Sequence, residues 1–322
     1  MSTCESIKKV AVVDLSYMMY KNRFAMSLLS VPVETADGVD MIPTGHIYGC
    51  ITDIKQLSFL NDIVILAVDS VAPERRELLP EYKAGRHKET GNSFDDYNIQ
   101  KDTDTILSLV CSMYSNVCFV REDGLEADDL IGSLIRHFGS RTDRFFLSVY
   151  HNDADILQTK GSYIWYRSLS DIEDISTYIS NKFKLVERSY DHLPVWYKVI
   201  RGDSSDKIPP AIRRLPSKLV EAIIMKTYDE LAGDDFSERS FDVFISCVDS
   251  VLSENTSWWV KSGCPLSKNT DCDTYKDLKR NYEVIKPIYK EFNIDFKIKK
   301  DQYVVDSSKV NEILSRYRIV HI

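Results

Sequence analysis

The sequence predicts an α/β fold: a central, mostly parallel twisted sheet flanked by helices, followed by a mostly helical part. Short apolar runs typical of buried parallel strands alternate with helical patterns over the first half of the chain. From about residue 186 the apolar spacing becomes predominantly helical. At 322 residues, with 43% hydrophobic and 28% charged residues, the chain has the composition of a globular protein with a sizeable core.

Two of the expected strands end in an aspartate. Residues 9–14 run into Asp14, and residues 63–69 run into Asp69. In open α/β sheets the ligand crevice lies at the carboxyl ends of the strands, so both side chains lie where chemistry is expected. A plain loop aspartate would explain either one alone. The remaining expected elements are a loop through Asp37, Gly38 and Pro43, helices over about 45–60 and 106–113, strands over 116–120 and 144–150, an edge strand over 163–167, and helices over 195–200 and 217–228.

An acidic cluster opens a further helix. Glu126, Asp128 and Asp129 fall within four residues, and Glu126 and Asp129 point the same way in the first turn because they are three apart. Acids that merely complement the helix dipole are an equally good explanation for this stretch alone. The apolar residues that follow have the spacing of one buried helix face: Ala127, Leu130, Ile131, Leu134, Ile135 and Phe138.

Two more acidic pairs occur later in the chain. Asp153 and Asp155 lie just beyond the strand over 144–150, in a pattern that often holds a metal. Asp203 and Asp206 lie three apart after Gly202, where both could face one ion. The alternative for the second pair is a glycine helix cap followed by an Asp-rich turn.

Together these motifs supply nine carboxylates, which predict a metal centre. Like charges in one cleft raise each other's pKa unless cations are present. Oxygen ligands without His or Cys select hard ions, so we expect two Mg²⁺ (or Mn²⁺). Two such ions about 4 Å apart would clamp the attacking and leaving oxygens of a phosphodiester. The chemistry expected is metal-assisted phosphodiester hydrolysis by Asp14, Asp69, Glu126, Asp128, Asp129, Asp153, Asp155, Asp203 and Asp206.

The segment over 70–105 is highly charged and broken by Pro and Gly. Its length and polarity predict a mobile lid or a solvated insertion outside the core. Cations interleaved with an aromatic residue fit phosphate contact and base stacking, although most charge runs are only solvated faces. The residues that carry this expectation are Arg75, Tyr82, Lys83, Arg86 and Lys88, with Lys83 or Arg86 neutralising charge that develops on the phosphate.

The net charge of −8 does not exclude nucleic acid. If the nine clustered acids are set aside, acids and bases are almost equal in number and leave room for basic patches. Seven cysteines without CxxC pairs predict reduced thiols in a cytoplasmic protein. No apolar run is long enough to cross a membrane, and no signal pattern is expected.

With these motifs in place, the chain resembles the 5′-nucleases: flap endonucleases, polymerase-associated 5′–3′ exonucleases and phage ribonuclease H-like enzymes. The resemblance covers roughly residues 9–225. The motifs occur in the family's order: Val13-Asp14, Val68-Asp69, Arg75 with Tyr82-Lys83-Ala84-Gly85-Arg86, Glu126-Ala127-Asp128-Asp129, Asp153-Ala154-Asp155 and Gly202-Asp203-Ser204-Ser205-Asp206. Length and divergence suggest a bacteriophage member, acting in the host cytoplasm.

The resemblance implies a PIN-like nuclease domain over 1–185, in which 70–105 forms a helical arch or gateway over the scissile phosphate. A mostly helical DNA-binding domain with a helix–three-turn–helix clamp would occupy 186–322. Tyr82, Lys83 and Arg86 would be arch residues, with Lys83 the electrophilic assistant and Arg75 the leading arginine. The first ion would be held by Asp14, Asp69, Glu126, Asp128 and Asp129, and the second by Asp153, Asp155, Asp203 and Asp206.

One departure concerns potassium. The family continues its second metal motif into a glycine-rich hairpin that holds K⁺ and duplex phosphates, whereas residues 206–216 contain no glycine. The resemblance therefore gives no reason to expect that this chain depends on K⁺. Three cationic side chains would replace the missing backbone contacts to the duplex: Arg213, Arg214 and Lys218. Lys207 is also expected to bind nucleic acid. Residues beyond about 235 match nothing in the family.

The expected protein is a monomeric, structure-specific 5′–3′ exonuclease and flap endonuclease. The resemblance implies primer removal in DNA replication, on DNA flaps, nicked duplexes and RNA–DNA hybrids. It also implies a polymerase, a clamp or a single-strand-binding protein as partners. No membrane contact is expected, because no apolar run is long enough to cross one. Two alternatives stay open: a catalytically silent DNA-binding relative and a PIN-type ribonuclease.

Overall fold

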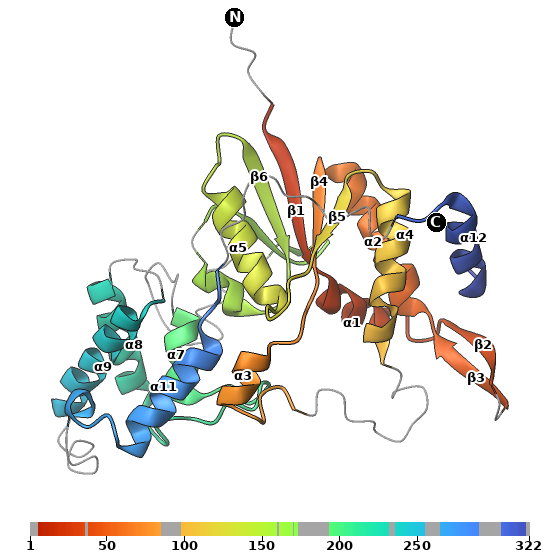
Figure 1. The fold of residues 1–322 in the computed structure, drawn as a ribbon. Helices are drawn as coiled ribbons and strands as arrows, with labels where there is room; N and C mark the ends of the chain where they lie inside the picture. The colour runs from red at the N-terminus through yellow and green to blue at the C-terminus, as the bar shows by residue number, and fades with distance from the viewer. Residues whose placement is uncertain are drawn as a thin grey trace, which may run out of the picture.

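The computed structural model describes nine stretches of the chain: residues 6–35, 38–84, 98–159, 161–169, 171–172, 193–231, 236–254, 265–289 and 304–319. Figure 1 shows a central sheet with helices on both faces and a separate group of helices beyond one of its ends. Among the described residues, no helix is long and apolar enough to cross a bilayer. The five described cysteines form no disulfide within that part of the chain.

The sheet has six strands in the order β5-β4-β1-β6-β7-β8. All neighbours are parallel except β7 and β8, which pair antiparallel. The mostly parallel sheet is therefore confirmed, and β7 is the last parallel strand with a two-residue strand at its edge. The bounds are β1 Lys8–Asp14, β4 Ile63–Ala67, β5 Val117–Val120, β6 Phe145–Tyr150, β7 Ile164–Ser168 and β8 Asp171–Ile172.

Both faces of the sheet are buried, which explains why its strands are apolar throughout rather than alternating. Val10 and Val12 of β1 belong to one core cluster, and Ala11 and Val13 belong to the other. Side chains along a strand point alternately to opposite faces, so β1 contributes to both cores. Helices α1 (Leu15–Ala25), α2 (Gly45–Leu60) and α4 (Thr103–Met113) cover one face, and α5 (Ala127–Gly139) covers the other.

Helix α5 packs as its spacing predicts. Every residue of the expected apolar stripe is buried, from Ala127 to Phe138. Fully burying side chains of this size is worth about 1.5–3 kcal/mol each, which holds the start of the helix firmly against the sheet. The acidic first turn of α5 is thereby fixed at the carboxyl ends of β1 and β4.

The helical group continues the core on the α5 face. Trp196 of α7 stacks on Phe244, with ring centroids 4.6 Å apart, and on Tyr282 at 5.3 Å. These residues join the same buried cluster as Val10 and Leu130. The helices are α7 Leu193–Arg201, α8 Ser217–Leu231, α9 Glu238–Ser253 and α11 Asp273–Ile285, and 3₁₀ turns occur at Ile99–Asp102, Ala154–Gln158 and Leu266–Lys268.

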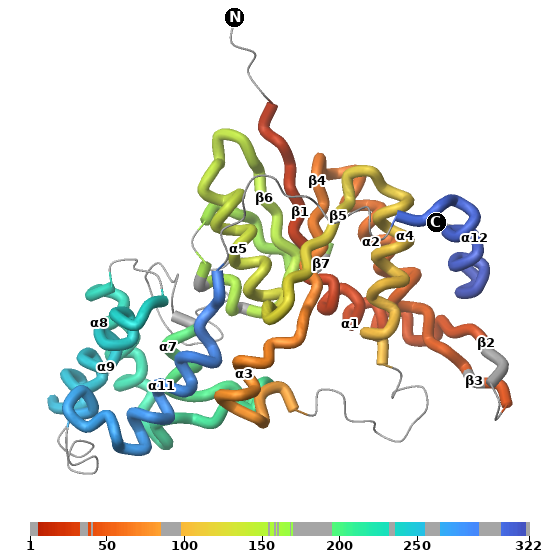
Figure 2. Tube along the Cα trace, viewed as in Figure 1, coloured from red at the N-terminus to blue at the C-terminus, as the bar shows by residue number. Residues whose placement is uncertain are grey.

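Segments far apart in the sequence meet in this group. Helix α3 (Pro73–Leu78) packs on α11, as the trace in Figure 2 shows below the sheet. The last helix, α12 (Ser307–Arg316), does not stay with the helical group. It packs on α4 at the opposite side of the sheet, where Tyr317 donates to Asp102 at 3.2 Å.

Two expectations about irregular segments were wrong. Strands β2 (Ser30–Thr35) and β3 (Gly38–Pro43) form an antiparallel hairpin where a loop was expected. The charged segment was expected outside the core, yet Arg75 and Tyr82 are only 6% and 5% exposed. Their burial is possible because both side chains pair with carboxylates, as described next.

Candidate active site

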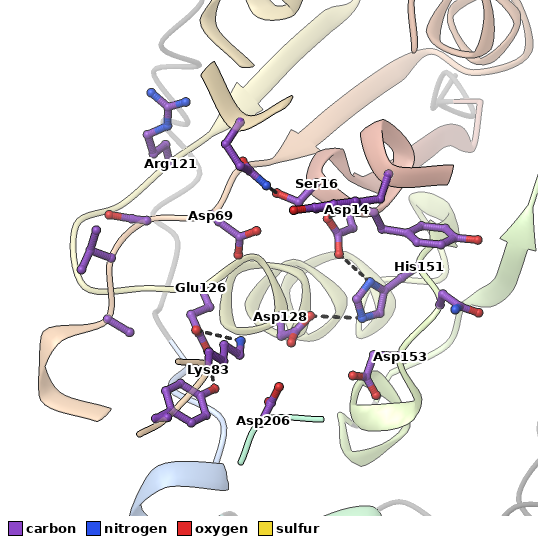
Figure 3. A pocket seen from close by; sticks show the side chains of 18 of the residues that line it. Asp14, Ser16, Asp69, Lys83, Arg121, Glu126, Asp128, His151, Asp153 and Asp206 are labelled. Atoms are coloured by element: carbon purple, nitrogen blue, oxygen red, sulfur yellow. Dashed lines mark hydrogen bonds and ion pairs between the residues drawn. The ribbon is translucent and has the colours of Figure 1, made fainter. Parts of the chain in front are cut away.

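A cleft of about 980 Å³ opens at the carboxyl ends of the central strands. Figure 3 shows acidic side chains from several elements converging on it. Asp14 ends β1, Asp69 follows β4, and Asp128 lies in the first turn of α5. The sequence placed these carboxylates after successive strands, and the parallel topology brings them to one edge. Asp153 and Asp206 line the same cleft.

A histidine lies between two of these carboxylates. His151 Nδ1 is 2.9 Å from Asp14 Oδ2, and His151 Nε2 is 3.1 Å from Asp128 Oδ1. Asp14 is itself fixed, because its Oδ1 accepts from the N–H of Tyr17 at 2.8 Å and caps α1. Burial alone would lower the pKa of His151, but the Asp128 and Asp14 carboxylates raise it well above 6.5.

His151 was not among the residues expected at the site, where all-oxygen ligands were predicted. It is the first residue after β6, the position at which carboxylates were sought after the other strands. A search for any ligand type at strand ends would have found it. Its side chain is 4% exposed, so it is part of the floor of the cleft and not of the rim.

The ionised form of Asp69 is disfavoured in this structure. Its Oδ1 accepts from the N–H of Ala127 at 2.8 Å, which ties β4 to the start of α5. Burial, and then the nearby Asp14 carboxylate, raise the pKa of Asp69 to about 6. A cation in the cleft would relieve this repulsion.

Glu126 and Asp129 face cations of the protein. Arg75 pairs with Glu126 and donates to Asp129 Oδ1 at 2.7 Å, and Lys83 Nζ donates to Glu126 Oε1 at 2.8 Å. Burial raises the pKa of Glu126, but Lys83 and Arg75 outweigh it, and the net pKa is lowered. Asp129 also accepts from the N–H of Ile288 at 2.9 Å. Both carboxylates are therefore engaged in a buried network that also anchors the charged segment.

Tyr82 belongs to this network and not to the surface. Its hydroxyl donates to Glu126 Oε2 at 2.9 Å, and burial raises the pKa of that hydroxyl. The ring is thus not exposed for base stacking in this structure. Arg86 and Lys88, the other expected arch cations, lie outside the described residues.

The backbone at Lys83 is unusual. Lys83 has φ 52°, in the left-handed region that non-glycine residues rarely adopt. Its N–H donates to the carbonyl of Asp206 at 3.0 Å, which ties the arch segment to the second acidic loop. Backbone strain of this kind persists where surrounding contacts fix the chain, as they often do at functional sites.

The second acidic group surrounds a lysine that the sequence reading did not single out. Lys198 Nζ lies 2.7 Å from both Asp155 Oδ2 and Asp203 Oδ2, and 4.0 Å from Asp153 Oδ1. Burial and the Asp153 carboxylate raise the pKa of Asp155 to about 7, against the opposing effect of Lys198. A lysine on the otherwise apolar face of α7 was the available signal. Asp155, Lys198 and Asp203 line a small cavity that shares Asp128 and Asp206 with the main cleft.

The loop that carries Asp203 is closed by glycine. Gly202 has φ 72° and ends α7, and a Cβ there would lie 2.2 Å from the carbonyl of Ile208. Asp203 and Ile208 then exchange two backbone hydrogen bonds. The glycine cap and the acidic loop are therefore both present. The four expected duplex-binding cations lie along this connection and at the start of α8, and all four are exposed: Lys207, Arg213, Arg214 and Lys218.

Arginines line the cleft beside the acidic floor. Arg76, Arg121 and Arg167 all contribute to its walls, and none of them was among the predicted binding residues. Arg121 pairs with Asp104 at 3.1 Å, and Arg167 donates to Asn152 at 2.8 Å. An acidic floor with basic walls suits a phosphate chain that approaches bound cations.

The residues at the cleft fit divalent cations. In the described part of the chain, one possible ligand atom each from Asp14, Asp128 and His151 lies within 4.8 Å of the others. The raised pKa of Asp69 shows that burial, and then the Asp14 carboxylate, disfavour its ionised form, a cost that a cation would offset. Carboxylate oxygens with one imidazole form a donor set that suits Mg²⁺ or a first-row transition ion.

A mostly parallel α/β sheet with this acidic cleft at its carboxyl edge defines the class of resolvase-like, PIN-like nuclease folds. The family model described as the N-terminal, resolvase-like domain of 5′-3′ exonuclease matches residues 9–186, more than half of the chain. The chain belongs to the 5′–3′ exonuclease family. The family expected from the motifs is thereby confirmed.

Curated relatives agree with this assignment. The chain is 27% identical over 217 residues to DNA polymerase I of Caldicellulosiruptor bescii, covering 62% of this chain and 22% of the polymerase. It is 26% identical over 237 residues to the 5′-3′ exonuclease of Mycoplasma pneumoniae, covering 71% of this chain and 74% of that protein. The chain thus corresponds to only a small part of the polymerase.

Solved structures share the fold. The T5 D15 protein crystallised with metal ions aligns at a TM-score of 0.53 with 15% identity, over 97% of this chain and 98% of that one. The bacteriophage T5 D15 flap endonuclease, in a pseudo-enzyme-product complex with DNA and metal ions, aligns at 0.54 with 14% identity, over 97% and 100%. At such identities the likeness concerns the fold.

Proposed function

We propose that this chain is a metal-dependent 5′–3′ exonuclease and flap endonuclease that hydrolyses phosphodiesters with two divalent ions. One observation carries the proposal: carboxylates from the ends of β1, β4 and β6, from the start of α5 and from the 203–208 loop line one cleft. Family membership and the metal-containing and DNA-containing structural relatives support it. The proposed substrates are DNA flaps, nicked duplexes and RNA–DNA hybrids, as in primer removal.

Two groups of side chains would each bind one ion. Asp14, Asp69 and Asp128 would hold the first ion, and the second would be held by Asp153, Asp155, Asp203 and Asp206. When bound, two divalent ions would lower the pKa of the attacking water and offset charge on the leaving oxygen. Glu126 and Asp129 lie behind the first group, where they fix Arg75 and Lys83.

Lys83 is the proposed electrophilic group. Its Nζ lines the cleft on a side chain that is 16% exposed, and Glu126 holds it by an ion pair. Burial alone would lower the pKa of Lys83, but Glu126 and neighbouring groups raise it, so the amine stays positive. A fixed positive charge at this point would stabilise negative charge that develops on the phosphate oxygens.

The walls and the α7–α8 connection are proposed to hold the nucleic acid. Arg76, Arg121 and Arg167 would contact phosphates near the cleft, and Arg213 and Arg214 would contact the duplex further away. Arg86 and Lys88 are also proposed to contact the nucleic acid from the arch. We propose no K⁺ site in this connection, because its sequence lacks the glycines that are found there in the family.

The direct test is cleavage of a 5′-labelled flap duplex in Mg²⁺ or Mn²⁺, against EDTA. A flapless hairpin and a nicked RNA–DNA duplex serve as comparison substrates. We expect metal-dependent cutting near the flap junction, which Asp153→Ala abolishes while flap binding is largely kept. Asp143→Ala removes an exposed carboxylate at the other end of β6 and should cut normally.

Two other outcomes would point elsewhere. Flap binding by the wild-type protein without cutting in either metal would favour a catalytically silent DNA-binding relative. Cutting of single-stranded RNA in preference to every duplex would favour a PIN-type ribonuclease.

A further inference from the structure

His151 is a buried imidazole at the floor of the cleft, between two of its carboxylates. Both of its ring nitrogens lie within 3.1 Å of a carboxylate oxygen. These contacts are ion pairs when the ring is protonated, whereas a neutral ring can donate a proton from only one of its nitrogens. The lone pair of the other nitrogen would then face an anion, a position that a bound metal ion would make favourable.

Asp128 Oδ1 and His151 Nε2 are spaced like two ligands of one ion. Ligands at about 2.1 Å from an octahedral ion lie about 3 Å apart along an edge of the octahedron. Asp128 Oδ1 lies 3.1 Å from His151 Nε2, which fits such an edge, whereas Asp14 Oδ2 lies 2.9 Å from the other nitrogen, Nδ1. Among the described residues, Asp14, Asp128 and His151 form the group whose ligand atoms are close enough to share an ion.

The two nitrogens are not equivalent. Nδ1 faces Asp14, whose other oxygen is held by the N–H of Tyr17 as the cap of α1. Nε2 faces Asp128, which is 33% exposed and points into the cleft toward Asp153 and Asp206 in Figure 3. A histidine that binds a metal through one nitrogen usually donates its other N–H to a carboxylate or carbonyl, which fixes the ring. Asp14 is placed to be that acceptor.

We propose that His151 binds the first ion through Nε2, beside Asp128, and gives this site a preference for transition-metal ions over Mg²⁺. The inference rests on the proposed function, because it concerns the ion that the first acidic group would hold. Imidazole is a better ligand for first-row transition ions than for Mg²⁺, which favours all-oxygen shells and retains water. A single nitrogen in a carboxylate shell thus shifts metal choice without changing the charge of the site.

The test is pulsed EPR of Mn²⁺ bound to the full-length protein. We expect ¹⁴N modulation from a coordinated imidazole in the wild type, lost in His151→Asp and in His151→Gln. The glutamine variant keeps a polar, uncharged side chain in case an added carboxylate prevents folding. His137→Gln, in the last turn of α5, is the matched control and should keep the nitrogen signal.

A competition titration measures the preference itself. The ratio of Mg²⁺ to Mn²⁺ needed to displace half of the Mn²⁺ should fall about 10-fold or more in His151→Gln, in line with the loss expected for a metal-site residue. Mn²⁺ that binds the wild type without nitrogen modulation would overturn the inference, and so would an unchanged ratio. Flap cleavage would then persist, and the proposed function would stand. A wild-type protein that neither binds Mn²⁺ nor cuts a flap would refute both.

Discussion

Asp69 should weaken the fold when no metal is bound, and its removal should stabilise the protein. The pKa of Asp69 rises from 3.8 to about 6 because of burial and the Asp14 carboxylate. Ionised Asp69 therefore costs the metal-free fold about 3 kcal/mol at pH 7. The Asp69→Asn variant would keep the side-chain oxygen that accepts from Ala127 and would remove the charge.

The sign and the pH window follow from the same shift. A carboxylate whose pKa is raised by folding binds protons more tightly in the native state, so stability is lost as pH rises from about 4 to about 6. Below that window Asp69 is neutral in both states and costs nothing. The advantage of Asp69→Asn should be about 1–3 kcal/mol at pH 7 and roughly half as large at pH 5.

Urea unfolding in EDTA at pH 7 and pH 5 measures this difference. Asp123→Asn, at an exposed position just before α5, is the matched control and should change stability by less than about 0.5 kcal/mol. Adding Mn²⁺ should reverse the order, because an ion bound only by the native state stabilises the wild type more. The reasoning would be refuted if Asp69→Asn were no more stable than the wild type at pH 7. It would also be refuted if the gain in stability over the wild type were as large at pH 5 as at pH 7.

Three further predictions address other parts of the molecule. Lys198→Met should destabilise the metal-free protein by about 3–5 kcal/mol in urea unfolding, because it leaves buried carboxylates without their cation; added Mg²⁺ should restore part of the loss, and no recovery would argue against an ion there. Trp196→Ala should lower the free energy of unfolding by about 3–5 kcal/mol, because the stacked aromatic core loses its central ring. A loss below about 1 kcal/mol would contradict the packing described for Trp196. Neutralising three exposed cations together should weaken duplex binding and reduce the slope of log K against log salt by up to about 3, whereas an unchanged slope would exclude them from the interface. The three are Arg213, Arg214 and Lys218.

The sequence predicted the sheet and α5 well, because both are specified locally. Apolar runs of strand length and a single buried stripe each leave a periodic signal. The hairpin over 30–43 was missed although Asp37-Gly38 is a strong turn signal. Prolines at positions 32 and 43 weaken a strand pattern, since proline cannot donate to a ladder.

The contacts of the site were less predictable than its carboxylates. Burial of Arg75 and Tyr82 depends on Glu126, some fifty residues later in the chain, so no local pattern reveals it. Lys198 likewise acquires its place only when α7 folds back on the acidic loops. Strand-end positions could be read from sequence, whereas the partners that neutralise each charge are set by tertiary packing.

The hydrogen bonds of Asp129 join parts of the chain that are synthesised at different times. Its Oδ1 accepts from Arg75 and from the N–H of Ile288, two donors separated by most of the chain. During synthesis the sheet and its acidic edge emerge well before residue 288 leaves the ribosome. A nascent chain can therefore assemble the strands and the Arg75 ion pairs early, but Asp129 receives its hydrogen bond from Ile288 only after residue 288 has been synthesised.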